Sequence, residues 1–205
     1  MSADVAAGPH PWSDGRRPST HGGSEFGRLI DNLRVLQDRV TAARPPADVI
    51  SAVADQLAAA AELLARYGVA EPDQVTGHRP DLPGRGQTMA PVFLVDEWDA
   101  EHASGRVTFG RFYLGGNGAV HGGAIPLLFD DVIGRLANTG RSVARTAYLH
   151  VDFRSVTPIE KPLRLRARFY REEGRKRFIH ATLHDGDRLC AEADGLFVML
   201  RPGQQ

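Results

Sequence analysis

Residues 115–131 read GGNGAVHGGAIPLLFDD, and this stretch decides how the rest of the chain is interpreted. It begins as a glycine-rich segment and continues as a strongly apolar one that ends in two adjacent carboxylates, Asp130 and Asp131. Glycine is used where the backbone must turn sharply or approach a ligand closely. Carboxylates in an apolar helix cost free energy unless they are partnered or used. The stretch therefore predicts a loop followed by a buried helix, with the functional site near their junction.

The predicted helix covers residues 122–139 and ends before Gly140, a residue suited to a helix C-terminus. Its apolar side chains lie around most of its circumference: Ile125, Leu127, Leu128, Phe129, Val132, Ile133 and Leu136. A helix that is apolar on nearly all sides is expected to be buried.

Strands are predicted on both sides of this helix, at residues 92–98 and 105–113 before it and in a four-strand meander after it. In residues 146–154 the alternation places Thr146 on the face opposite Leu149 and Val151. In the last strand the apolar alternation changes phase at Asp194-Gly195, which predicts a β-bulge there. One long helix against one curved antiparallel sheet is an α+β architecture.

The chain is predicted to divide into four parts. Residues 1–23, rich in Gly, Pro, Ser, His and Arg, are expected to be a flexible tail. Residues 24–68 carry two apolar stripes at helical spacing, interrupted by Pro45-Pro46, and predict a helical hairpin. Residues 69–88 are a linker, and residues 89–205 form the main domain. The hairpin lacks a cluster of acids, bases or metal ligands, so we expect it to cover a surface of the main domain or of a partner subunit.

Composition excludes several classes of protein. The 205 residues contain 25 Lys and Arg against 25 Asp and Glu, and this balance argues against a nucleic-acid-binding protein. Cys190 is the single cysteine, so no intrachain disulfide forms, as expected in a reducing compartment. No apolar run approaches the ~20 residues of a membrane span, and no secretory signal opens the chain. A cytoplasmic protein is expected.

The junction of loop and helix offers the groups needed to polarise a carbonyl. The first turn of a helix presents unpaired backbone N–H groups, and Gly122 and Gly123 would let a carbonyl oxygen approach them. Asp130 lies about two turns further along, and Asp131 points about 100° away from it. Residue types alone do not decide whether Asp130 is a catalytic carboxylate or a buried one that accepts hydrogen bonds from backbone N–H groups. His121 is likewise open between a catalytic base and a ring that fixes the loop.

No metal or organic cofactor is predicted. A second His or Cys at metal-ligand spacing is missing near His121. The loop matches neither a nucleotide-binding P-loop nor a dinucleotide-binding fingerprint, and no serine-hydrolase elbow is present.

Two segments together resemble the hotdog-fold acyl-CoA thioesterases of the PaaI-like group. The first is residues 120–125, VHGGAI, with Asp130 nine residues after the histidine; the second is the strand Thr146-x-x-Leu149-x-Val151-Asp152-Phe153 with Thr157-Pro158 after it. The resemblance covers about residues 90–201 and implies a long helix wrapped by an antiparallel sheet. It also implies a homodimer or a dimer of dimers with active sites at the subunit interface, acting on an acyl-CoA or acyl-carrier thioester.

The resemblance further implies a role for individual residues. Asp130 matches the acid that serves as general base or nucleophile, and Gly122 matches the residue whose N–H polarises the thioester carbonyl. Thr146 matches a Ser or Thr, contributed from the other subunit, that orients the water or the acid. Asn117, His121 and Gly123 are expected to contact the substrate. Candidates for the basic mouth of a pantetheine and phosphate channel are Arg154, Lys161, Arg164, Lys176 and Arg177. A charged strand face is more often simply solvated, so none of them is assigned as a ligand.

One position departs from the family pattern. Many members carry Asn or Gln six residues before the histidine, and here that position is Gly115, with Asn117 two residues nearer. A non-catalytic acyl-CoA-binding or regulatory hotdog protein is therefore the alternative to a thioesterase. A hotdog hydratase is disfavoured, because no Asp lies between Tyr113 and His121.

Overall fold

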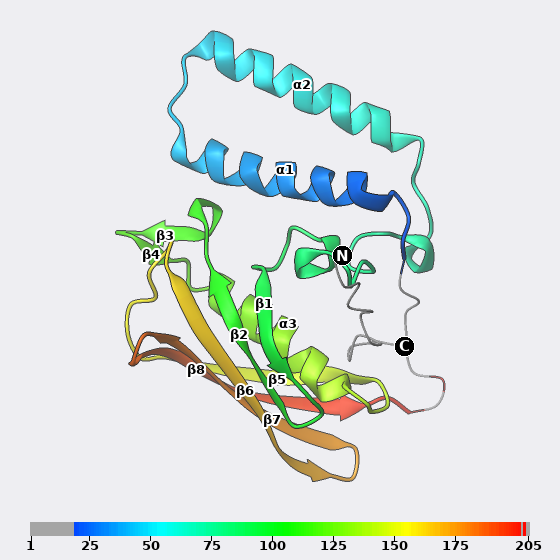
Figure 1. Ribbon diagram of the computed structural model, residues 1–205, viewed down its shortest axis with the longest axis vertical. Coiled ribbons are helices and arrows are strands. Elements are labelled where there is room, and N and C mark those ends of the chain that lie inside the picture. The colour runs from blue at the N-terminus through cyan, green and yellow to red at the C-terminus, as the bar shows by residue number, and fades with distance from the viewer. Residues whose placement is uncertain (1–18, 202, 204–205) are drawn as a thin grey trace, which may run out of the picture.

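The computed structural model describes residues 19–201 and residue 203. Of the tail predicted for residues 1–23, residues 1–18 lie outside the described part of the chain, and Gly23 already begins the first helix. The described residues form two N-terminal helices, one long central helix and a large antiparallel sheet (Figure 1).

A six-stranded antiparallel sheet forms the body of the molecule, with the strand order β1-β2-β6-β7-β8-β5. Its strands are β1 (Phe93–Trp98), β2 (His102–Thr108), β5 (Ala144–Phe153), β6 (Pro162–Glu173), β7 (Lys176–Asp185) and β8 (Arg188–Met199). Two short strands, β3 (Leu114–Gly116) and β4 (Ala119–Val120), pair separately. The predicted strand at residues 105–113 is displaced: β2 ends at Thr108, and a 3₁₀ turn, η3 (Arg111–Tyr113), follows it.

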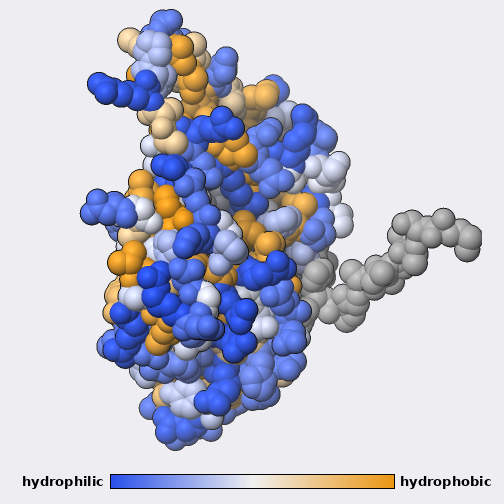
Figure 2. Space-filling view, turned by 60° about the vertical axis from the view of Figure 1, so that its left-hand side comes forward, coloured by the Kyte–Doolittle hydropathy of each residue, from blue (hydrophilic) through white to orange (hydrophobic). Residues whose placement is uncertain are grey.

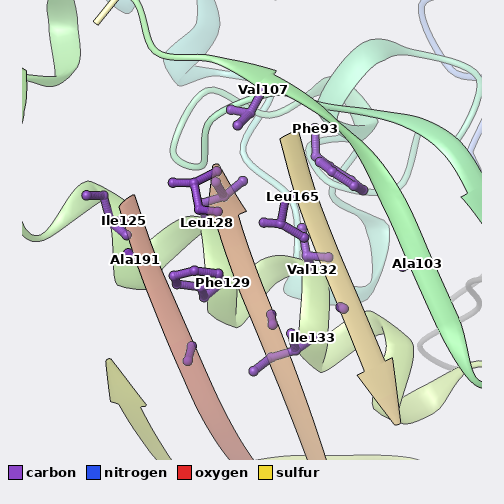
Figure 3. Close-up of a cluster of buried hydrophobic side chains, with 14 of the residues drawn as sticks. Phe93, Ala103, Val107, Ile125, Leu128, Phe129, Val132, Ile133, Leu165 and Ala191 are labelled. Carbon is purple, nitrogen blue, oxygen red and sulfur yellow. The ribbon is translucent and has the colours of Figure 1, made fainter. Parts of the chain in front are cut away.

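Helix α3 (Ala124–Asn138) lies against one face of this sheet, as Figure 1 shows. Eight of its residues are buried, and Leu128, Phe129, Val132 and Ile133 are fully enclosed by side chains of the strands (Figure 3). The prediction of a buried helix is confirmed, although the helix begins two residues later than expected. The predicted α+β class is confirmed too, with the helix-on-sheet arrangement that the hotdog resemblance implied.

The bulge predicted at Asp194-Gly195 is wrong: the register shift near these residues lies in the neighbouring strand β5, and the shift within β8 itself falls at Cys190, on the side that pairs with β7. In β8 the inward positions Ala191, Ala193, Gly195 and Phe197 alternate without interruption. The register instead shifts in β5 between Thr146, opposite Phe197, and Tyr148, opposite Leu196. A Cβ at Gly195 would lie only 2.5 Å from Ile133 Cδ1 of α3, so this inward position has no room for an apolar side chain. Because Gly195 has no side chain at this inward position, the alternation of apolar residues in β8 looks interrupted in the sequence although the strand continues.

Two N-terminal helices, α1 (Gly23–Ala42) and α2 (Ala47–Ala65), form the predicted hairpin. Helix α1 lies along the body and buries Gly27 and Ile30, whereas α2 buries none of its residues. Figure 2 shows hydrophobic residues at the surface of the hairpin, at the top of the view. The expected covering role is therefore seen within this chain for α1 alone. The predicted linker after α2 contains two short 3₁₀ turns, η1 (Glu71–Asp73) and η2 (Pro83–Gly86).

Candidate functional site

The glycine-rich segment is a two-residue hairpin turn between β3 and β4. Asn117 and Gly118 occupy the turn with φ values of 49° and 73°, the conformation in which Asn-Gly is favoured. Asn117 is exposed at the tip of this turn. Its predicted contact with substrate stays a prediction, and the turn itself explains why Asn is there.

Gly115 lies directly against the backbone of His121. A Cβ built at Gly115 would be 2.7 Å from His121 Cα and 3.0 Å from its amide nitrogen. Contacts below 3.0 Å are not tolerated by rigid backbone, so an Asn or Gln side chain has no place here without moving the loop. The departure from the family pattern therefore follows from how closely β3 and the residues after β4 approach each other.

His121 fastens the loop to the start of α3. Its Nδ1 accepts a hydrogen bond from the Gly123 amide at 3.0 Å, and its own amide donates to the Tyr113 carbonyl at 2.7 Å. Its carbonyl accepts from the Ala124 amide at 2.9 Å. Because the Gly123 N–H is already bonded to the His121 ring, the prediction that both glycine amides are open to a carbonyl oxygen is wrong for Gly123.

The Gly122 amide is different. Among residues 19–201 and 203, the structure gives no acceptor for its N–H, and the residue is exposed. Within 4 Å of a Cβ built at Gly122, and apart from its chain neighbours, the described residues place only the ring of Phe153 in β5, at 4.0 Å. Of the two predicted carbonyl-polarising amides, Gly122 is thus the one that a ligand could reach.

Asp130 and Thr146 meet across the interface of α3 and β5. The Thr146 hydroxyl donates to Asp130 Oδ1 at 2.9 Å, and the Asp130 side chain is half-buried. The β5 bulge makes this contact possible, because it turns Thr146 to the same face as Leu149 and Val151, both of which pack on the core. The predicted opposite orientation of Thr146 is wrong for this reason. Thr146 and Asp130 of one chain form a pair without help from a second chain.

Asp131 occupies a partly buried ionic cluster on another side of α3. Its Oδ1 accepts from Arg85 Nη2 at 2.9 Å, and its Oδ2 lies 3.0 Å from Arg135 Nη2. Burial alone would raise the pKa of Asp131, but the charges and hydrogen bonds of Arg135 and Arg85 outweigh it and hold that pKa below its ordinary 3.8. Burial lowers the pKa of Arg135 to about 10 against the opposing charge of Asp131, so Asp131 and Arg135 are both ionised at neutral pH.

Sequence reasoning anticipated that the two aspartates differ but missed the partners of Asp131. The ion pair with Arg135 could have been predicted from the sequence, because residues four apart on a helix are neighbours. The ion pair with Arg85 could not, because Arg85 comes from the predicted linker, 46 residues away, through turn η2.

Two of the basic residues considered for a channel mouth are engaged elsewhere. Arg177 is buried and donates to the Ala137 carbonyl at 2.9 Å and the Ser142 carbonyl at 2.6 Å, so it closes the C-terminal end of α3. Arg154 forms ion pairs with Asp152 and Glu192. A hollow of about 180 Å³ on β6 and the β7–β8 turn involves Arg164 and Arg166 but none of the loop or α3 residues.

Within residues 19–201 and 203, no group of three or more His, Cys, Asp and Glu is placed to hold a metal ion. Over the same residues, none of the helices combines the length and apolar character needed to cross a bilayer.

A helix packed on a curved antiparallel sheet, with a glycine loop before the helix and an acid two turns into it, defines a hotdog-fold protein. Residues 117–192 match the model of the thioesterase superfamily. That segment holds the β3–β4 turn, α3 and most of the sheet.

Known proteins similar to the chain agree with this family. Acyl-coenzyme A thioesterase THEM4 of Mus musculus is 34% identical over 87 residues, covering 42% of this chain and 37% of the mouse protein. The Bos taurus protein of the same name is 33% identical over 95 residues, or 45% of this chain and 39% of the bovine one. The matched region is thus well under two thirds of these relatives.

Solved structures extend the similarity beyond the family segment. A crystal structure of a thioesterase superfamily protein aligns over 89% of this chain and 97% of its own, with 26% identity and a TM-score of 0.74. A Streptococcus mutans protein bound to acetyl CoA shares the fold at 16% identity and a TM-score of 0.50, over 53% of this chain.

Proposed function

We propose that this chain hydrolyses acyl-CoA or acyl-carrier thioesters to a free acid and a thiol. The observation that carries the proposal is the Thr146–Asp130 hydrogen bond in a segment that matches the thioesterase superfamily and also has an open Gly122 amide. The names of the THEM4 relatives support the acyl-CoA class.

In the proposed reaction Gly122 polarises the thioester carbonyl. Its N–H would donate to the carbonyl oxygen and stabilise the negative charge that develops there as the carbonyl carbon is attacked. The His121 ring holds the neighbouring Gly123 amide at 3.0 Å, so its role is to set the backbone of this loop. Asn117 and Gly123 remain residues that border the substrate.

Asp130 is the proposed base or nucleophile. As a base it removes a proton from water while the water oxygen attacks the carbonyl carbon; the C–S bond then breaks, and the thiol leaves with a proton. As a nucleophile it attacks the carbon itself, and the C–S bond breaks to release the thiolate. Water then hydrolyses the resulting anhydride, which returns the Asp130 carboxylate, frees the acid and supplies the proton that the thiolate takes up. In both routes the Thr146 hydroxyl fixes one carboxylate oxygen and leaves the other for chemistry.

The spacing of these groups supports an active site shared by two copies. Asp130 lies six residues, or about 9 Å along the helix axis, beyond Ala124, where α3 begins, and Gly122 precedes that residue. An oxyanion donor and an attacking group both act within about 3 Å of the same carbonyl. We therefore propose a homodimer, or a dimer of dimers, in which the Asp130–Thr146 pair of one copy faces Gly122 of the other.

A thiol-release assay over a panel of acyl-CoA esters tests the proposed function. The purified full chain is expected to release free CoA from at least one aliphatic or aromatic ester well above the rate without protein. Folded protein that releases no thiol from any ester of the panel, or from an acyl-carrier substrate, would refute the hydrolase.

Gly115 favours a second candidate, an acyl-CoA-binding protein without hydrolytic activity. The family pattern places here an Asn or Gln that contacts substrate or water, and the close approach of His121 leaves no room for such a side chain unless the loop moves. Binding of an acyl-CoA by calorimetry, with no thiol released during the titration, would identify this function in place of the first.

A further inference from the structure

Helix α1 lies outside the residues that match the thioesterase family, yet it contacts both segments that flank the candidate site. It packs on η2 and on η3, the two turns that precede the sheet and the glycine loop. Two charged side chains, Arg34 and Asp38, come from the side of α1 that also buries Gly27 and Ile30. Each makes a hydrogen bond to the backbone of one of these turns.

Asp38 holds the segment that leads to the glycine loop. Its Oδ1 accepts from the Phe112 amide at 2.8 Å. The carboxylate reaches this amide across Gly110, where a Cβ would collide with both carboxylate oxygens. The next residue, Tyr113, offers its carbonyl to the His121 amide at 2.7 Å, and His121 then fixes the Gly123 amide at 3.0 Å. A short chain of hydrogen bonds therefore connects Asp38 to both sides of Gly122.

Arg34 holds the turn that carries Arg85 to Asp131. Its Nη2 donates to the Pro83 carbonyl at 2.9 Å and to the Gln87 carbonyl at 2.6 Å, and so brackets the turn at both ends. Within it, Gly84, Arg85 and Gly86 all have positive φ, at 59°, 59° and 68°. A non-glycine residue at positive φ is unfavourable unless its surroundings impose it. Arg85 then bonds Asp131, the residue next to Asp130.

From these contacts we infer that α1 is a positioning element of the proposed active site. Asp38 acts through residues 112–113 on the Gly122 loop, and Arg34 acts through residues 83–87 on the part of α3 that carries Asp130. Neither side chain touches substrate; both are positioning residues. The inference rests on the proposed function for its catalytic consequence, whereas the mechanical coupling stands without it.

The variant Asp38→Ala tests the coupling, with Asp38→Asn keeping an acceptor oxygen and Asp55→Ala on the exposed helix α2 as a matched control. Loss of the acceptor frees the Phe112 amide, so amide hydrogen exchange over residues 112–123 is expected to quicken in Asp38→Ala. Exchange should stay near wild type in Asp38→Asn and in Asp55→Ala. Arg34→Met should quicken exchange over residues 83–87 in the same way. These measurements need no substrate.

Kinetics on the same proteins test the catalytic consequence. A misplaced oxyanion donor reduces the stabilisation of the transition state more than it reduces the binding of the substrate. We therefore expect Asp38→Ala to lower kcat about 10-fold with KM within twofold, and Asp38→Asn to restore most of the loss. Exchange and kcat in Asp38→Ala that match those of Asp55→Ala would overturn the inference. An inactive wild type with the expected exchange pattern would refute the proposed function and leave the coupling standing.

Discussion

Asp130 and Asp131 are adjacent in the sequence and sit on the same helix, yet they have opposite surroundings. Asp130 is half-buried and accepts a hydrogen bond from one neutral hydroxyl, that of Thr146, at 2.9 Å. Asp131 lies between two guanidinium groups, with Arg85 at 2.9 Å and Arg135 at 3.0 Å. One carboxylate oxygen of Asp130 is therefore left for a substrate or water, whereas both carboxylate oxygens of Asp131 are engaged in ion pairs.

The comparison shows that two adjacent residues of one helix can have different roles, because their side chains point to different neighbours. Successive side chains point about 100° apart, so one faces β5 and the other faces the N-terminal segment. Ion pairing lowers the pKa of Asp131 and stabilises its charged form. We expect Asp130 to be the residue that activity depends on and Asp131 the residue that folding depends on.

The largest expected effect is on activity when Asp130 becomes Asn. The substitution keeps the size of the side chain and removes the base or nucleophile, so kcat/KM should fall by about 10³-fold. The circular dichroism spectrum and Tm should remain close to those of wild type. An Asp130→Asn enzyme with unchanged turnover would show that another group does the chemistry.

Next in size is the loss of stability when Asp131 becomes Asn. Breaking a buried ion pair leaves Arg135 with an uncompensated buried charge, and the free energy of unfolding should fall by about 3 kcal/mol. Denaturant titration measures this change, with Asp130→Asn as the matched control. Equal losses of unfolding free energy in Asp130→Asn and Asp131→Asn would contradict the inference that folding depends on Asp131 more than on Asp130.

A mixing experiment locates Asp130 relative to Gly122. Asp130→Asn is refolded together with Gly122→Pro, which removes the amide hydrogen, while Gly122→Ala retains it. If the site is shared, a mixed dimer has one intact site, and the mixture should recover roughly a quarter of wild-type activity. A mixture as inactive as its two components would place Gly122 and Asp130 of one chain in the same site.

The smallest expected effect is on the pH dependence of stability. The pKa of Asp131 is lower in the folded chain than its ordinary 3.8, so its stabilisation is complete above about pH 4 and is lost as pH falls through the folded-state pKa. The stability gap between wild type and Asp131→Asn should therefore narrow at acid pH. A gap that is constant from pH 7 to pH 3 would contradict the ion-pair assignment.

Several features of the fold could be predicted from the sequence because they depend on local patterns. The burial of α3 follows from its apolar circumference, and the Asn117-Gly118 turn occupies the glycine-rich segment that was expected to be a loop. The two N-terminal helices were recognisable from their stripes and from Pro45-Pro46. The reason for a glycine at position 115 could not be recognised in this way, because it is the close approach of the His121 backbone, six residues later.

The candidate site could be predicted only in part. Asp130 and Gly122 stay predictions that rest on the loop and the helix, and the orientation of Thr146 depends on a bulge in β5 that the sequence pattern did not indicate. Arg34, Asp38 and Arg85 carry no local signal at all. Their hydrogen bonds reach residues 46 to 74 positions away.

The amino-acid sequence by itself determined an α+β fold around one buried helix, because apolar periodicity and turn residues act within a few positions. It also determined that two carboxylates on that helix differ, because helical geometry sets their directions. Only the tertiary structure decided which carboxylate is neutralised by arginines and which meets a hydroxyl. That choice depends on side chains brought together from distant segments, and their pairing is settled by packing and not by any local preference.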